Sequence, residues 1–188
     1  MEHKTWYSRG YLPHFDSPGT IQTIVFRLAD SFSSAELTRL TLKFNTNPDS
    51  IKQDYIEECM HKGHGDCHLK DPALAKIVED ALLFFDDQRY RLLTWVVMPN
   101  HVHTMVEMVE GYPIADILKS WKGYSAREIN KVLGRSGQFW SRDYFDRYIR
   151  TIDHYYDALN YIHMNPVIAG LVQRPEDWPF SSANRIVG

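Results

Sequence analysis

The chain has 188 residues, a formal net charge of -3 and 44% hydrophobic residues, a composition that predicts one domain (residues 1–188) with a full hydrophobic core. No apolar run approaches the roughly 20 residues that a membrane-spanning helix needs, and the first residues lack the apolar core of a signal peptide. With two cysteines, too few for a disulfide framework, we expect a soluble, cytoplasmic protein.

The first third of the chain predicts one strand followed by an insertion. Turn-forming residues are frequent up to position 19, so we expect this opening segment to lie as a loop across the sheet. Residues 20–28 are β-branched and apolar, which predicts the first strand. Apolar side chains then recur at helical spacing in residues 34–44 and 48–60, and these two helices form a helical insertion at about residues 31–65.

The middle of the chain predicts a helix and a hairpin. Asp71-Pro72 supplies an N-cap and a first helical position, and an apolar stripe follows to about Phe85. Residues 90–97 are almost continuously apolar, as is typical of a strand buried on both faces. Pro99-Asn100 forms the turn, and residues 101–109 return antiparallel.

The last third predicts a helix, a strand and a second helix. Residues 113–133 form a long helix, and residues 139–150 form one short, irregular strand. Asp153 caps a final helix over residues 155–164, which Asn165-Pro166 ends, and a C-terminal tail follows from residue 166.

This order of elements predicts the fold class. Strands are few, and helices alternate with them after the insertion. The order favours an α+β fold close to the ferredoxin-like plan, with helices on one side of a mostly antiparallel sheet.

Charge is distributed unevenly along this order. Lys and Arg number 11 against 17 Asp and Glu in residues 1–118, and 2 against 4 in residues 151–188. Residues 119–150 carry 8 against 3 and are therefore basic, at +5. A basic block in an acidic chain is typical of a phosphate-binding surface, although an ordinary solvated helix face would also produce it.

His101 and His103 are a candidate pair of metal ligands. Side chains alternate along a strand, so both imidazoles lie on one face of the strand that begins at His101. A catalytic divalent metal needs further ligands and an open position. On this motif alone, two histidines that form hydrogen bonds at a sheet edge are the favoured interpretation.

Tyr161 and Asn165 lie four residues apart and therefore on one face of the last helix. If that face meets the sheet near the two histidines, Asn165 completes a three-ligand site and Tyr161 stands beside the metal as a nucleophile. The alternative is a packing aromatic and a helix C-cap. His163, two residues from Tyr161, is a second-choice ligand.

Several longer motifs carry a family resemblance. MPNHVH, YIHMNPVIAGLV and DWPFSS resemble the single-tyrosine transposases of the HUH nuclease superfamily, and most closely the REP-associated tyrosine transposases. RGYLPHFDSPG, RYRLLTWVVMPNHVH, KSWKGYSAREIN and GQFWSRDYFDRYIR also resemble that family. The resemblance covers most of the chain, and the helical insertion matches least well.

The resemblance implies a reaction and a role for each candidate. His101, His103 and Asn165 would hold Mg²⁺ or Mn²⁺, and Tyr161 would attack the scissile phosphate of single-stranded DNA. The product would be a 5′-phosphotyrosine and a free 3′-hydroxyl, which permits rejoining without ATP. Mg²⁺ is the ion expected in the cell, although imidazole ligands suit Mn²⁺ better. The implied target is a palindromic repeat hairpin.

Other readings of the same residues are a hairpin-binding regulator that does not cut, and a metallohydrolase that uses water as its nucleophile. Five further tyrosines could compete with Tyr161, but only Tyr161 has an amide ligand candidate four residues on, directly before the helix stop. The five are Tyr124, Tyr144, Tyr148, Tyr155 and Tyr156. The resemblance to REP-associated members favours a monomer over a homodimer.

The basic block would supply the DNA-binding surface. Its candidate phosphate contacts are Lys119, Lys122, Arg127, Lys131, Arg135, Arg142, Arg147 and Arg150. Trp121, Tyr124 or Trp140 could stack on splayed bases, with core packing as the alternative for each.

One cluster lies outside this scheme. Cys59, His61, His64, Cys67 and His68 include enough soft ligands for a tetrahedral zinc site, although their spacing matches no standard zinc finger. The alternative is a glycine-containing loop near the DNA.

Overall fold

The computed structural model describes residues 5–8, 13–33, 35, 36, 38, 56 and 58–185. Its elements, in chain order, are β1 (Thr5–Ser8), β2 (Pro13–Asp16), β3 (Ile21–Leu28), η1 (His68–Lys70), α3 (Pro72–Leu83), β4 (Tyr90–Val97), β5 (His101–Met108), α4 (Ile114–Val132), β6 (Trp140–Tyr148), α5 (Ile152–Ile168), η2 (Pro175–Asp177) and α6 (Ser182–Arg185). None of the helices described here combines the length and the apolar character of a transmembrane span.

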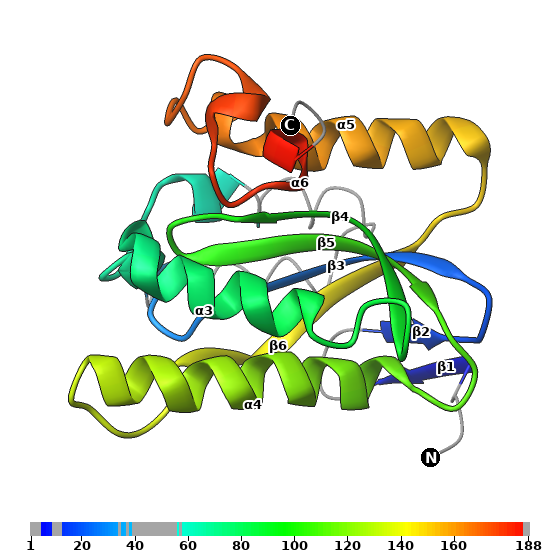
Figure 1. The fold of residues 1–188 in the computed structure, drawn as a ribbon, viewed down its shortest axis with the longest axis horizontal. Coiled ribbons are helices and arrows are strands. Elements are labelled where there is room, and N and C mark those ends of the chain that lie inside the picture. Colours follow the sequence, from blue (N-terminus) through cyan, green and yellow to red (C-terminus); the bar gives the residue numbers. More distant parts are fainter. Residues whose placement is uncertain are drawn as a thin grey trace.

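Four strands form the central sheet, in the order β4-β5-β3-β6 (Figure 1). All three neighbouring pairs are antiparallel. The chain therefore crosses over β5 on its way from β3 to β4, and over β3 on its way from β5 to β6. This is the ferredoxin-like topology, so the α+β prediction is confirmed. The predicted strands and the helices α3 and α4 also lie close to their expected positions.

Helices cover both faces of this sheet. α3 and α4 lie together on one face, and their apolar side chains form the main core with Val102 and Val106 of β5 (Figure 1). α5 packs on the opposite face, where Ile162 joins Met105 of β5 and Val96 of β4. The expectation that the helices share one side is thus corrected. β4 and β5 are apolar on both faces, so each face needs a cover.

α5 is longer than the sequence predicts. It begins after Thr151, whose hydroxyl accepts a 3.2 Å hydrogen bond from the His154 amide, so Asp153 is not the cap. It then continues through Pro166 instead of ending there. Pro166 lacks an N–H donor, but it is buried, and the Ala169 amide bonds to the Asn165 carbonyl 3.0 Å away to hold the last turn. Asn165 consequently lies within the helix.

The opening segment contains a β-hairpin where a loop was expected, because β1 and β2 pair antiparallel. Asp146 of β6 anchors it, since its carboxylate contacts His14 and accepts a 3.1 Å hydrogen bond from the Phe15 amide. The predicted insertion helices lie largely outside the described residues; residues 35, 36, 38, 56 and 58–61 are helical.

The C-terminal tail covers the edge strand β4. The Val97 amide donates to the Phe180 carbonyl at 2.9 Å, and the Trp178 indole donates to the Val97 carbonyl at 2.9 Å. Ser182 also bonds to Thr94 at 2.8 Å. The DWPFSS motif therefore satisfies backbone groups that an edge strand would otherwise expose.

A buried hydrogen-bond chain joins the helices to β4 and yields a stability prediction. The Trp121 indole donates to the Tyr90 hydroxyl at 2.7 Å, which donates to the Leu82 carbonyl at 2.6 Å. We expect Tyr90→Phe to lower the free energy of unfolding by about 1–3 kcal/mol, because two buried polar groups lose their partner. Urea titration measures the loss, with the exposed Arg91→Ala as control. A change below about 0.5 kcal/mol, within the range of surface substitutions, would contradict the prediction.

Candidate functional site

The two histidines lie side by side on the α5 face of the sheet. His101 pairs with Arg27 of β3, and His103 pairs with Val25 of β3 and Val96 of β4. Their ring centroids are 4.8 Å apart, and the residues are only 1% and 2% exposed. The alternation of β5 thus places both imidazoles at one spot, on rigid backbone and away from bulk water.

α5 brings the two predicted partners to the same place. The Tyr161 ring centroid lies 5.8 Å from that of His103. Asn165 is fully buried one turn later, and its Oδ1 accepts a 2.9 Å hydrogen bond from Nε2 of His61, whose ring centroid is 6.1 Å from that of His101. The structure therefore brings together all four side chains singled out in the sequence, and adds His61 to them.

The electrostatics keep both histidines neutral near pH 7. Burial holds the pKa of His101 well below its usual value, helped by the nearby His103 and His61, while Asn165 opposes the shift. Burial, with His61, likewise lowers the pKa of His103 to about 3. Neutral imidazoles carry a lone pair on one nitrogen, which a metal ion requires.

Asn100 sets the tautomer of His101. Its Nδ2 donates to the Met60 carbonyl at 3.1 Å, and because a carbonyl can only accept, its Oδ1 must face the other way. That Oδ1 lies 2.7 Å from His101 Nδ1, which must therefore carry the proton. The lone pair of His101 is consequently on Nε2.

The donor set fits a divalent cation. Nε2 of His101 and Nε2 of His103 are buried and make no hydrogen bond with a described residue. Within the described ranges, no three His, Cys, Asp or Glu side chains form a group that could hold a metal ion. A cation here would therefore take two imidazole nitrogens and the amide oxygen of Asn165, with further positions left for substrate oxygens.

The other candidate ligands point elsewhere. His163 Nε2 lies 2.9 Å from the Ser182 hydroxyl, which places it toward the tail. The candidate zinc cluster is dispersed: His64 pairs with Glu36 at 3.2 Å, His68 contacts Arg135 at 3.1 Å, and His61 reaches Asn165. The part of the chain described by the structure thus does not assemble this zinc site.

The competing tyrosines lie in different surroundings. Tyr144 is in the main core, on the sheet face away from the histidines, and Tyr124 is on α4. Tyr156 is 61% exposed, and Tyr155 packs in the cluster beneath α5. Tyr148 ends β6, where the Arg150 guanidinium lies 4.6 Å from its ring centre.

Three predicted DNA contacts line a cleft of about 530 Å³ between α4 and β6: Lys119, Lys122 and Arg142. The Lys122 ammonium donates to the Ser141 carbonyl at 2.6 Å and the Arg142 carbonyl at 3.2 Å. Burial lowers the pKa of Lys122 to about 8, although Asp143 opposes the shift. A partly buried lysine with a lowered pKa at a cleft is a candidate anchor for one phosphate.

The other predicted cations are more dispersed. Arg127 and Lys131 are exposed on α4, and both pair with Glu128. Arg135 follows α4, whereas Arg147 and Arg150 lie near the N-terminus of α5. Burial is the main cause that lowers the pKa of His154 on α5, and the positive charges of these two arginines lower it further. The charge excess seen in the sequence is therefore divided between two parts of the surface.

Two predicted stacking residues belong to the core. Trp121 is 1% exposed, because it lies on the apolar stripe of α4 that faces the sheet, so its prediction as a base-stacking residue is wrong. Trp140 is 4% exposed and donates to the Ser125 hydroxyl at 2.9 Å. Tyr124 is 45% exposed and stays a candidate for stacking.

Sequence reasoning missed His61 and Asn100 as parts of the site. The sequence patterns assigned both residues other roles, His61 as a member of the candidate zinc cluster and Asn100 as a turn residue. The contact of His61 with Asn165 joins residues 104 positions apart, which no local pattern specifies.

Comparisons with known proteins show the family of this chain. The family model described as "Transposase IS200 like" matches residues 70–165, just over half of the chain. The chain is 32% identical over 104 residues to a REP-associated tyrosine transposase of Escherichia coli (strain K12), covering 54% of this chain and 59% of that protein. A Haemophilus influenzae protein assigned provisionally to the same class is 28% identical over 101 residues, covering 48% of this chain and 57% of its own. The chain thus matches little more than half the length of these relatives.

A solved structure shares the fold. It is a REP-associated tyrosine transposase bound to a REP hairpin, with a TM-score of 0.62 and 20% sequence identity. The match covers 96% of this chain and 84% of the other.

Lys122 gives a pH prediction. Its pKa is about 8 in the folded chain, and an unfolded lysine has a pKa near 10.5. Between these values the unfolded chain binds more protons, so stability must rise with pH in that window. We expect the free energy of unfolding of the wild type, relative to Lys122→Met, to increase by about 1–2 kcal/mol between pH 7.5 and 10. Urea titrations at both pH values measure this difference, and a flat difference would contradict the assignment.

Proposed function

The chain belongs to the IS200-like transposase family, and we propose that it cuts and rejoins single-stranded DNA at repeat hairpins through a covalent bond to Tyr161. One observation carries the proposal. Tyr161 on α5 reaches the His101/His103 pair on β5, although the two elements are far apart in sequence. A phenol beside a potential metal site suits nucleophilic attack on a phosphodiester.

The chemistry assigns each atom a task. Oη of Tyr161 attacks the scissile phosphorus and loses its proton, forming a bond between the tyrosine oxygen and phosphorus. The bond from phosphorus to the 3′ oxygen breaks, and that oxygen leaves as a hydroxyl after taking up a proton. Because one phosphoester replaces another, a second 3′-hydroxyl can reverse the step and rejoin strands.

His101, His103 and Asn165 would hold Mg²⁺ or Mn²⁺, which, when bound, would polarise the scissile phosphate and stabilise its developing charge. The chain itself contributes rigid placement. The histidines are fixed by the sheet, Asn165 is held inside α5, and burial excludes bulk water from the reacting group.

The cleft between α4 and β6 supplies a surface for the DNA. Lys119, Lys122 and Arg142 can contact phosphates there, and exposed Tyr124 on α4 can stack on an unpaired base. A structural relative at 20% identity was solved with a REP hairpin bound. We propose the same class of ligand, a hairpin with short single-stranded flanks, for this chain.

A covalent adduct tests the proposed reaction. We expect wild-type protein incubated with a labelled hairpin oligonucleotide and Mn²⁺ to form a protein–DNA adduct that survives denaturing electrophoresis. Tyr161→Phe should abolish the adduct and retain hairpin binding, because the ring stays and the attacking oxygen is lost. Tyr156→Phe, an exposed tyrosine on the same helix, serves as the matched control.

Each failure has a distinct meaning. Binding without any adduct in the wild type would favour a regulator that does not cut. Cleavage that survives in Tyr161→Phe would favour hydrolysis with water as the nucleophile.

Salt dependence tests the cleft. We expect Lys119→Ala and Arg142→Ala each to weaken hairpin binding and to reduce the slope of log affinity against log salt by about 0.7–0.9, one phosphate contact apiece. Fluorescence anisotropy at several salt concentrations measures the slope. Lys76→Ala on α3, whose partner is Asp80, and the core substitution Trp121→Phe should leave the slope unchanged. Equal slopes in all variants would place the DNA elsewhere.

A further inference from the structure

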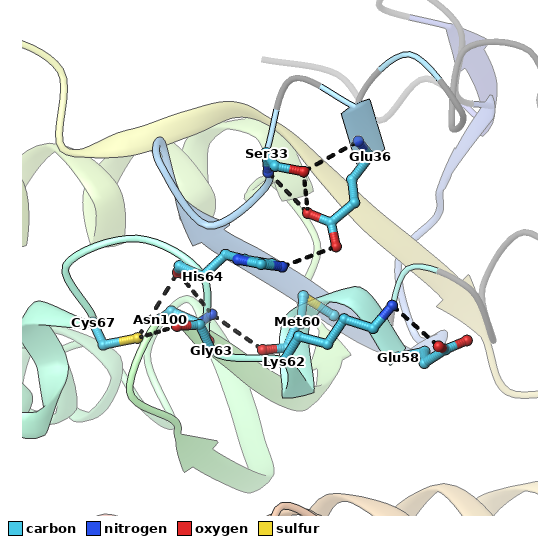
Figure 2. Close-up of polar contacts among 9 residues, drawn as sticks. All are labelled: Ser33, Glu36, Glu58, Met60, Lys62, Gly63, His64, Cys67 and Asn100. Atoms are coloured by element: carbon cyan, nitrogen blue, oxygen red, sulfur yellow. Dashed lines mark hydrogen bonds and ion pairs between the residues drawn. The ribbon is translucent and has the colours of Figure 1, made fainter.

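The segment of residues 58–68, here called the insertion arm, packs on the turn that precedes the two histidines. Figure 2 shows Asn100 between the carbonyls of Met60 and His64, to which its Nδ2 donates at 3.1 and 3.5 Å. The Leu69 amide, just beyond the arm, adds a 3.1 Å hydrogen bond to the Pro99 carbonyl. The arm is therefore joined to the strand that carries the proposed metal ligands.

The arm has its own internal supports. Cys67 Sγ donates to the Gly63 carbonyl at 3.2 Å, and His64 pairs with Glu36 at 3.2 Å (Figure 2). Gly65 has a φ of +83°, and a Cβ there would lie 2.7 Å from Asp30, so this position requires glycine. Asp30 also accepts a 2.8 Å hydrogen bond from the Asp66 amide. These contacts define the path of the arm next to the site.

His61 reaches from this arm into the site. Its Nε2 lies 2.9 Å from Oδ1 of Asn165, and since that oxygen can only accept, the proton must be on Nε2. Oδ1 has a second lone pair, which is available to a metal ion. By contrast, Nδ2 of Asn165 is buried and makes no hydrogen bond with a described residue. The hydrogen bond from His61 thus distinguishes the oxygen end of the Asn165 carboxamide from its nitrogen end.

We infer that His61 is a positioning residue of the catalytic site, which holds the Asn165 carboxamide with its oxygen toward the His101/His103 pair. The inference rests on the proposed function, because it concerns the ligand set assigned there. Without His61, the buried carboxamide could rotate by half a turn and present its NH₂ group, which cannot bind a cation. Hydrogen bonds from outside the ligand set commonly orient ligands in this way.

His61 acts through Asn165 and not as a ligand itself. Within the described residues, His61, His101 and His103 do not form a group that could hold a metal ion. The nitrogen of His61 nearest the site is already engaged with the Asn165 oxygen. The arm would therefore contribute orientation, while β5 and α5 contribute the donor atoms.

The affinity of the full chain for Mn²⁺ tests the inference without DNA. The electron paramagnetic resonance signal of the free ion measures this affinity. We expect His61→Phe to weaken Mn²⁺ binding by about 10-fold or more, the usual effect of losing such a contact. His61→Gln should bind within about threefold of the wild type, because its amide N–H can donate to Asn165. Lys62→Ala, an exposed neighbour paired with Glu58, should bind normally.

The controls separate this inference from the proposed function. His101→Ala should lose Mn²⁺ binding, and if it binds like the wild type, the proposed metal site is wrong. If His101→Ala loses binding but His61→Phe and His61→Ala both bind like the wild type, the positioning inference alone is overturned. Thermal unfolding checks that each variant is folded, and His61→Ala, which adds no bulk, replaces His61→Phe if the latter is unstable. Restoration by His61→Gln is the result that a merely structural histidine would not give.

Discussion

The burial of β5 on both faces is the constraint on which the rest of this molecule depends. Alternate side chains of a strand point in opposite directions, so Val102 and Val106 can join the main core while His101 and His103 face α5. A shift of one residue in register would exchange these two sets. The apolar half of the strand therefore fixes the histidines, and the main core on one face positions the chemistry on the other.

Placing polar atoms on a buried face has a cost. Each unpaired Nε2 of His101 and His103 lowers stability by about 1–3 kcal/mol relative to a satisfied group. Apolar residues at both positions would pack the α5 face more favourably. Neutral imidazoles reduce the cost, since burying them as cations would be far more expensive. The lowered pKa values and the buried lone pairs are thus two results of the same burial.

Local patterns predicted much of this fold and most of the proposed site. The alternation around His101 and His103 and the four-residue spacing of Tyr161 and Asn165 are local properties, and the structure places these side chains as the patterns required. Tertiary contacts decided the rest. Trp121 is core because of the sheet it faces, and Pro166 lies buried inside α5 instead of ending it. The residue pattern within one helix cannot indicate which other elements surround Trp121 or Pro166.

The insertion shows most clearly where local reasoning stops. His61 lies 104 positions before Asn165 and contacts it directly, while Asn100 holds the preceding residue of the arm, Met60, at the turn. Asn100 accepts from His101 with one end of its carboxamide and donates to the arm with the other. The arm is therefore coupled to two of the three proposed ligands, through different hydrogen bonds. Strand and helix bring the donor atoms together, but their orientation depends on a segment that the strand and helix patterns do not include.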